Sequence, residues 1–382
     1  MKPIYLDYNA TTPIDPEVAE AMAPYLFERF GNPSSSHWYG VQTKRAVETA
    51  RQQVANLLNC SPDEVVFTSG GSESNNYAIK GVAFANRGKG NHLITSSIEH
   101  PAVIEVCNYL EERGFQVTYL PVDHFGQVDP PAVEKAITSN TVLISIMHAN
   151  NEVGTIQPIP EIARIAGDRG IVLHTDAAQS VGKIPTRINH LGVDLLTIAG
   201  HKLYGPKGIG ALYVRRGIEL EKLVHGAGHE QGRRAGTENV LEIVGLGKAC
   251  EIAERDLRKN MDHMQKMRDL LYQELKKEWP ELRLNGHPER RLPNTLSVSF
   301  KNIEANKLLT EIHEVAASAG AACHSGSVKV SPVLRAMQVE LEYAMGTVRF
   351  STGKMTTAEE VKETAAIFVE TARRLQAEKQ KW

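Results

Sequence analysis

Apolar and polar positions follow two periods along the first two-thirds of the chain. Apolar runs of strand length recur between Val65 and Val214, and most are separated by segments with the spacing of amphipathic helices. The predicted strands are Val65–Thr68, His92–Ser96, Gln116–Leu120, Val142–His148, Ile171–Thr175, Leu195–Ala199 and Gly210–Val214. This alternation predicts an α/β domain with a mainly parallel sheet that helices cover on both faces.

The regions on either side of this sheet are predicted to be richer in helix. The helical patterns are Glu17–Phe30, Val41–Leu58, Val240–Glu278, Asn306–Glu314 and Thr357–Lys379. The later strand-like segments are Leu282–Leu284, Thr295–Phe300 and Val348–Ser351, and Tyr5–Pro13 is predicted to be an extended arm. We therefore predict a large domain over residues 14–255 and a smaller α+β domain over residues 1–13 and 256–382.

Composition narrows the class of protein. The 382 residues exceed the size at which a single core stops growing, and 42% hydrophobic with 23% charged residues is ordinary for a globular protein. The formal net charge of −2 gives no reason to expect a nucleic-acid or membrane partner. Because no N-terminal stretch has the pattern of a signal peptide, we expect a cytoplasmic protein.

Four cysteines are too few and too scattered for a disulfide framework, and no Cys-x-x-Cys pair offers a zinc site. His225 and His229 have only small residues between them and no third ligand nearby, so we expect no metal. Cys107 and Cys250 lie in helical patterns typical of core residues. Cys323 differs, because small residues on both sides predict a loop that can approach a ligand.

Lys202 lies in a glycine-rich turn, Gly200–Gly210, between two apolar strands. Burial disfavours an ammonium group and lowers its pKa, which suits a lysine that must lose its proton and form an imine. An ordinary loop lysine remains the alternative for this stretch alone.

A second glycine turn, Thr68–Asn76, joins a strand to a helix that is predicted to begin near Ser72. Its backbone N–H groups, the helix N-terminus and the Ser72 hydroxyl can hold a phosphate. The turn matches neither the dinucleotide-binding nor the nucleoside-triphosphate motif. A helix cap without a ligand is the alternative.

Four polar residues follow other predicted strands. Asp176 ends an apolar strand, where its carboxylate needs a cationic partner such as a protonated ring nitrogen, unless it merely caps a helix. Gln179 can reach a phenolic oxygen, His100 can stack on a flat ring, and Asn151 can donate to a carboxylate. Together with Lys202 and the phosphate turn, these residues indicate a pyridoxal 5'-phosphate site.

The sequence resembles the cysteine desulfurase family, in the NifS/IscS-like branch of the class V aminotransferase group, over essentially its whole length. The motifs that carry the resemblance are Tyr5-Leu-Asp-Tyr-Asn-Ala-Thr-Thr, Thr68-Ser-Gly-Gly-Ser-Glu-Ser-Asn-Asn, Glu99-His-Pro-Ala-Val, Asn150-Asn-Glu-Val-Gly, His174-Thr-Asp-Ala-Ala-Gln, Gly200-His-Lys-Leu-Tyr-Gly-Pro-Lys-Gly-Ile-Gly, Arg234-Ala-Gly-Thr-Glu-Asn and Val348-Arg-Phe-Ser. It implies the type I pyridoxal-phosphate-dependent transferase fold, with a large and a small domain.

The resemblance also implies a role for each site residue. Lys202 would form the imine with the cofactor, His100 would stack on its ring, and Cys323 would be the nucleophile that takes sulfur. The cofactor-binding residues implied are Gly71, Ser72, His100, Asp176, Gln179, His201 and Lys202, with Thr237 reaching across from the second subunit of a homodimer. The substrate carboxylate would be bound by Asn151 and Arg349.

The expected reaction converts L-cysteine to L-alanine and leaves a persulfide on Cys323 for a sulfur-acceptor protein. Two departures from the family pattern stand out: Ala199 replaces a serine that contacts the phosphate in many desulfurases, and His324 follows the cysteine. The sequence Cys-His-Ser resembles selenocysteine lyases, so the main rival reaction is release of selenium from L-selenocysteine. The sequence also leaves open an ordinary aminotransferase and a non-enzymatic docking scaffold.

Overall fold

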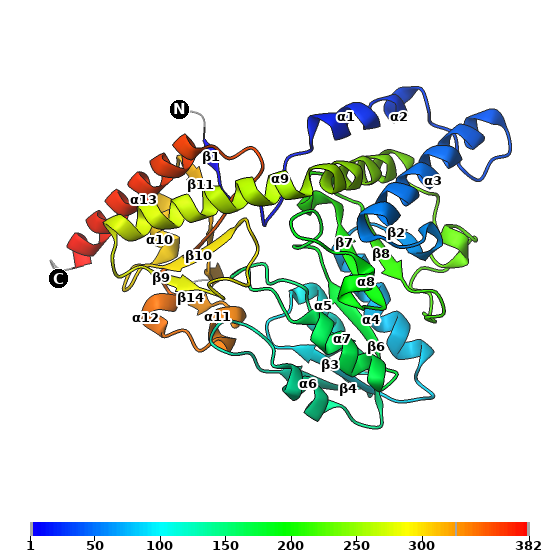
Figure 1. Ribbon diagram of the computed structural model, residues 1–382, viewed down its shortest axis with the longest axis horizontal. Helices are drawn as coiled ribbons and strands as arrows, with labels where there is room; N and C mark the ends of the chain where they lie inside the picture. Colours follow the sequence, from blue (N-terminus) through cyan, green and yellow to red (C-terminus); the bar gives the residue numbers. More distant parts are fainter. Residues whose placement is uncertain (1–2, 325–326, 380–382) are drawn as a thin grey trace.

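The computed structural model describes residues 3–324 and 327–379 and contains a large unit built on a seven-stranded sheet (Figure 1). The strand order is β2-β8-β7-β6-β5-β3-β4, in which β8 runs antiparallel to β2 and β7, and the other pairs are parallel. The strands are β2 (Val65–Thr68), β3 (His92–Ser96), β4 (Gln116–Leu120), β5 (Thr141–Ser145), β6 (Val172–Asp176), β7 (Leu195–Ala199) and β8 (Gly210–Val214). The predicted, mainly parallel sheet is therefore confirmed.

Alternate residues of a strand such as β2 enter opposite hydrophobic cores, as the pleat requires. Val65 and Phe67 belong to one core with residues of α3 (Trp38–Leu58), α7 (Ile159–Asp168) and α9 (Val240–Glu278). Val66 belongs to the opposite core, with α4 (Gly71–Ala85) and α5 (Pro101–Glu111). Because both sets are apolar, the sheet is sandwiched between two helical layers.

A smaller unit contains a four-stranded antiparallel sheet of order β12-β15-β10-β9. Its elements are β9 (Arg283–Asn285), β10 (Thr295–Ser299), α10 (Ala305–Glu311), β11 (Val315–Ala316), β12 (Ser318–Ala319), β15 (Thr347–Ser351) and α13 (Ala358–Lys379). The N-terminal strand β1 (Ile4–Tyr5) pairs in parallel with β11, and Ile4 and Leu6 join the hydrophobic core of this unit. The first residues of the chain thus belong to its C-terminal part.

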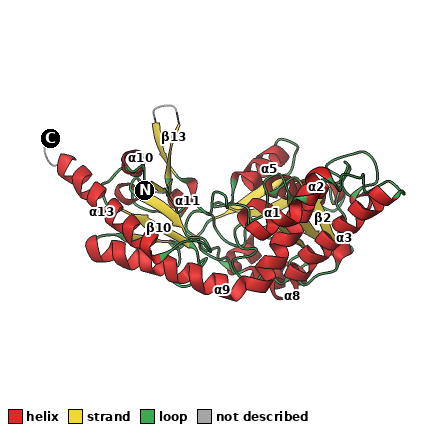
Figure 2. Ribbon diagram, turned by 90° about the horizontal axis from the view of Figure 1, so that it is seen from above, coloured by secondary structure: helices red, strands yellow, loops and turns green. Residues whose placement is uncertain are grey.

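A β-hairpin projects from the smaller unit (Figure 2). It consists of β13 (Ala321–His324) and β14 (Ser327–Val330), paired antiparallel with Cys323 opposite Val328. The Ser331 hydroxyl then accepts a hydrogen bond from the Val333 N–H (3.0 Å) and caps α11 (Pro332–Ala336). The remaining short helices are α6 (Pro130–Ala136), α8 (Ile188–Leu191) and α12 (Leu341–Ala344), with 3-10 turns at Pro62–Glu64, Gly200–Lys202 and Glu230–Gly232.

Helix α9 is common to both units (Figure 1). Its residues up to Ala253 pack in a core of the large unit, whereas Met267 and later residues pack in the core of the smaller one. The domain boundary that we predict at residue 255 lies inside this continuous helix.

Most predicted elements are present, with ends shifted by a few residues, but the helix predicted at Glu17–Phe30 is wrong. The chain instead forms α1 (Pro16–Met22) and α2 (Pro24–Phe27). Pro24 lacks an N–H group and cannot continue the hydrogen-bonding pattern of α1, so the helix ends before it. None of the described helices has the length and apolar character needed to cross a membrane.

Gly210 at the start of β8 makes the closest backbone approach next to the phosphate turn. A Cβ atom there would lie 2.5 Å from the Ile198 carbonyl oxygen and 2.7 Å from the Gly70 Cα. We expect Gly210→Ala to lower the free energy of unfolding in urea by about 1–3 kcal/mol, because the sheet must shift to accept the methyl group. Gly167→Ala, in α7 with no atom within 4 Å of the new methyl group, is the control and should be neutral or slightly stabilising. Equal destabilisation by both changes would contradict the explanation.

Candidate functional site

A cavity of about 330 Å³ opens at the carboxyl ends of the sheet strands and contains most of the predicted site residues. Gly71, Ser72, His100, Asn151, Asp176, Gln179, His201, Lys202 and Arg349 all line it. Arg349 comes from the smaller unit, and Asn9 and Ala10 of the N-terminal segment complete the wall. Ligands of open α/β sheets bind at this edge, so the position agrees with the fold.

Lys202 ends the 3-10 turn that follows β7, and its amine points toward the N-terminal segment. Its Nζ donates to the backbone carbonyls of Asn9 (2.5 Å) and Ala10 (2.8 Å). Burial, and then the nearby positive charge of Arg349, lowers the pKa of Lys202 to about 8. About a tenth of this amine is therefore unprotonated at pH 7, far more than for an ordinary lysine, and can act as a nucleophile or base.

Asp176, at the end of β6, is buried but has only uncharged donors around it. Its Oδ2 accepts from the Asn75 side chain (2.7 Å) and its Oδ1 from the Ala178 N–H (2.9 Å). No lysine or arginine forms an ion pair with it in the described part of the chain, and the Asn75 Oδ1 has no hydrogen-bond partner there. A buried carboxylate with this donor set suits a cationic ring nitrogen.

The opposite end of the cavity suits a phosphate. Helix α4 begins at Gly71, one residue earlier than predicted, so its N-terminal N–H groups and the Ser72 hydroxyl border the cavity. A Cβ on Gly71 would lie 3.3 Å from the Ala199 Cβ, so the glycine lets the turn approach β7 closely. His201 lies alongside; burial and neighbouring lysines lower its pKa to about 4, so its ring is neutral and can donate one hydrogen bond.

His100 is the N-cap residue of α5. Its Nδ1 accepts a hydrogen bond from the Ala102 N–H (3.1 Å), and burial lowers its pKa. An imidazole fixed in this way lines the cavity, as stacking on an aromatic cofactor requires.

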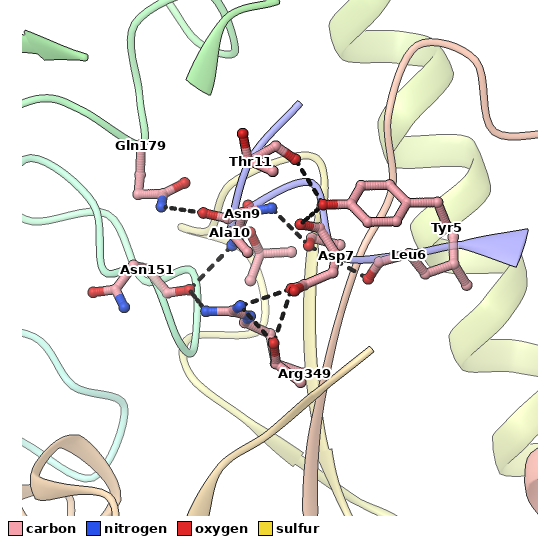
Figure 3. A network of polar contacts seen from close by, with 12 residues as sticks. Tyr5, Leu6, Asp7, Asn9, Ala10, Thr11, Asn151, Gln179 and Arg349 are labelled. Carbon is pink, nitrogen blue, oxygen red and sulfur yellow. Dashed lines mark hydrogen bonds and ion pairs between the residues drawn. The ribbon is translucent and has the colours of Figure 1, made fainter. Parts of the chain in front are cut away.

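Arg349, on β15, is held by three different elements (Figure 3). Its Nη2 donates to Asp7 Oδ1 (2.8 Å) and Ser318 Oγ (2.9 Å), and its Nη1 donates to the Asn151 carbonyl (3.1 Å). The guanidinium therefore lies beside Asn151, the other residue that is predicted to bind a carboxylate.

Sequence reasoning missed the contribution of the N-terminal segment to the site. The Asn9 carbonyl accepts from Lys202 and from Gln179 Nε2 (3.0 Å), and the Asn9 side chain donates to the Asn151 carbonyl (3.1 Å). Behind Gln179, the buried Lys183 donates to its Oε1 (2.9 Å), and burial lowers the pKa of Lys183. The polar pair Asp7 and Asn9 in a strand-like arm was the available signal.

Among the predicted site residues whose side chains are described, Thr237 does not line this cavity. Thr237 is exposed in the segment between the turn at Glu230–Gly232 and α9. Cys323 lies in strand β13 rather than in the predicted loop, and its side chain falls outside the described residues. Cys107 and Cys250 are buried core residues, as predicted, and no group of three potential metal ligands occurs among the described residues.

The cavity residues fit pyridoxal phosphate. The unpaired carboxylate of Asp176, the amine of Lys202 and the helix N-terminus at Gly71 supply the three different kinds of contact that the ring nitrogen, the aldehyde carbon and the phosphate of this cofactor need.

Comparisons with known proteins agree with this arrangement. Residues 4–364 match the family model described as aminotransferase class-V. The chain is 49% identical over 384 residues to the cysteine desulfurase IscS of Dictyoglomus turgidum, covering 99% of this chain and 98% of that protein. The structure of a NifS-like protein is similar, with a TM-score of 0.92 and 40% identity over 98% of this chain and 100% of that chain. SspA in complex with cysteine has a TM-score of 0.83 and 40% identity over 93% and 100% of the two chains.

The low pKa of Lys202 can be measured without cofactor. In the apoprotein, the rate of reductive methylation of Lys202, followed by mass spectrometry of its peptide, should rise with pH and level off above about pH 8. Because Arg349 helps to lower this pKa, Arg349→Gln should move the midpoint to higher pH. A wild-type midpoint near the ordinary lysine value of about 10.4 would show that Lys202 is not deprotonated by its site.

Proposed function

Because the chain belongs to the cysteine desulfurases of the class V aminotransferase family, we propose that it converts L-cysteine to L-alanine and collects the sulfur on Cys323. Pyridoxal 5'-phosphate is the cofactor. The observation that carries the proposal is the single cavity in which Lys202, Asp176 and Arg349 come together. These groups supply a base, a partner for a cationic ring and a carboxylate site.

The residues divide the binding of substrate and cofactor between them. Arg349 and Asn151 bind the α-carboxylate of the amino acid, the guanidinium through two parallel hydrogen bonds. Gly71, Ser72 and His201 would hold the phosphate, Gln179 would donate to the phenolic oxygen, and His100 would stack on the ring. Asp176 keeps the ring nitrogen protonated, and when bound, the cofactor withdraws electrons from the substrate Cα.

Lys202 and Cys323 carry out the proton and sulfur transfers. The neutral Nζ of Lys202 takes the Cα proton of the substrate. The Cys323 thiolate attacks the substrate sulfur; an S–S bond forms as the Cβ–S bond breaks, and the electron pair remains on carbon. Protonation of that carbon and return of a proton to Cα from Lys202 give L-alanine, and the sulfur stays on Cys323 as a persulfide. Because Cys323 lies on a projecting hairpin, we propose that a sulfur-acceptor protein receives the sulfur there, for iron–sulfur cluster assembly or another biosynthesis (Figure 2).

We further propose a homodimer. An apolar patch at α2 and the start of α3 consists of the exposed side chains Leu26, Phe27, Phe30, Trp38 and Val41. Phe27 is 82%, Phe30 70% and Trp38 61% exposed, which is unusual for side chains of this size unless a partner covers them. Pro33, between Phe30 and Trp38 in sequence, and Glu238, next to Thr237, line a shared cavity of about 410 Å³. A second copy seated on the patch would therefore meet the segment that carries Thr237, the residue expected to reach the partner's phosphate.

The alternative of a selenocysteine lyase is supported by one feature, His324 directly after Cys323. A lyase would use the same cavity and cofactor, so only substrate preference separates the two functions.

Alanine formation from L-cysteine and from L-selenocysteine, measured side by side with saturating cofactor, tests the proposed function. We expect turnover of L-cysteine and a loss of at least ~100-fold in Cys323→Ala, because the sulfur then has no nucleophile. Cys107→Ala is the control and should retain activity, because this buried thiol is far from solvent. Rapid turnover of selenocysteine, with cysteine acting only as an inhibitor, would instead support the lyase.

The dimer is tested by Phe30→Arg. A charge within the apolar patch should shift the protein from dimer to monomer in analytical ultracentrifugation and weaken cofactor retention, because Thr237 no longer reaches its neighbour. Leu341→Arg is the matched control; Leu341 is 67% exposed on α12, away from the patch, and this change should leave the dimer intact. A dimeric Phe30→Arg protein with unchanged cofactor affinity would contradict the proposed interface.

A further inference from the structure

Arg349 already has a carboxylate partner within the chain. Asp7 Oδ1 lies 2.8 Å from Arg349 Nη2, and the side chains are only 18% and 13% exposed. The Ser318 hydroxyl closes a triangle, because it accepts from Nη2 (2.9 Å) and donates to the same Asp7 oxygen (2.9 Å). Figure 3 shows Asp7 reaching the guanidinium from the N-terminal segment.

A substrate carboxylate needs donors of the same guanidinium. Nη2 is shared between Asp7 and Ser318, Nη1 donates to the Asn151 carbonyl, and the buried Nε has no hydrogen-bond partner in the described part of the chain. A carboxylate that accepts two hydrogen bonds from Arg349, one of them from Nη2, therefore displaces Asp7. A carboxylate that accepts instead from Nε and the free hydrogen of Nη1 places a second anion beside Asp7. Both arrangements cost binding free energy relative to an unpaired arginine.

We propose that Asp7 is a positioning residue that weakens the carboxylate subsite by competing for Arg349. The proposal rests on the proposed function, through the role of Arg349 in binding the substrate carboxylate. Asp7 holds the guanidinium at the cavity wall and at the same time limits how tightly any amino acid binds there.

Competition by Asp7 affects release of the product as well as binding of the substrate. L-cysteine and L-alanine carry the same α-carboxylate, so affinity from Arg349 acts equally on substrate and product. Such uniform binding lowers KM without raising kcat, and it retains the product. An internal carboxylate that returns to Arg349 favours release of L-alanine.

Asp7 is also close enough to act on the charge of Lys202. Its negative charge opposes the effects of burial and of Arg349 on the pKa of the Lys202 amine. Loss of the carboxylate therefore moves two measurable quantities, the affinity for carboxylates upward and the pKa of Lys202 downward.

The test compares binding of L-alanine to the wild-type and Asp7→Asn holoenzymes, followed by cofactor absorbance and by calorimetry. L-alanine has the substrate carboxylate but no sulfur to transfer, so binding is measured apart from turnover. We expect roughly threefold to tenfold tighter binding by Asp7→Asn, since Arg349 is released from its ion pair. The KM for L-cysteine should fall by a similar factor, with stronger product inhibition.

The sign of the effect separates competition from a structural role. If Asp7 only shaped the site, Asp7→Asn would bind L-alanine more weakly or equally, and this result would overturn the proposal. Asp168→Asn, at an exposed ion pair with Arg164, is the matched control and should change nothing. In an Arg349→Gln background the gain should disappear, because the two residues act on the same ligand group.

Two further measurements keep the outcomes distinct. Thermal unfolding of both variants shows whether Asp7→Asn folds properly. If it does not, Asp7→Ala takes its place and should also bind L-alanine more tightly than the wild type. Tighter L-alanine binding in a protein whose wild type does not turn over L-cysteine would uphold the carboxylate subsite and refute the desulfurase function. Turnover of L-cysteine by the wild type, without tighter L-alanine binding in either Asp7 variant, would uphold the desulfurase function and refute the competition by Asp7.

Discussion

The backbone carbonyls of Asn9 and Ala10 hold the amine of Lys202, and the rest of the site depends on this contact. The carbonyls are uncharged, so they orient the lysine without stabilising its ammonium form as a carboxylate would. Burial can therefore keep the pKa of the amine low while its position stays fixed. Of the two carboxylates near it, Asp176 is engaged by Asn75 and Asp7 by Arg349. Neither one forms an ion pair with Lys202 in the described residues.

The charged groups of the site thus come from different elements of the fold. The cation at Arg349 comes from the smaller unit, the anion at Asp176 from the end of a buried strand, and the amine from a turn between two strands. The N-terminal segment connects these parts, because Asn9 contacts Gln179, Lys202 and the Asn151 carbonyl. A site assembled in this way needs both units in place before contacts such as that of Arg349 with the Asn151 carbonyl can form.

The sequence predicted the large unit well, because its signals are local. Apolar runs such as Leu195–Ala199 are bounded by glycine turns, and each site residue of this unit follows a strand. The end of helix α1 before Pro24 could have been predicted from the sequence, since proline cannot continue a helix. The polar pair Asp7 and Asn9 marked the N-terminal arm, but the partners of these residues and of Lys183 could not be predicted. Those partners are distant in the sequence, as Arg349 is from Asp7 and Asn9 is from Lys183. No local pattern encodes a partner more than 150 residues away.

The pairing of β1 with β11 has a consequence for how the protein is made. Ile4 lies opposite Val315, so β1 leaves the ribosome about 310 residues before its partner strand and stays unpaired until then. The sheet of the large unit ends at Val214 and can form during synthesis, while the N-terminal segment waits for the C-terminal part. Contacts of such long sequence separation form slowly. The last folding event is then expected to be the docking of the N-terminal segment, and that same event completes the active site.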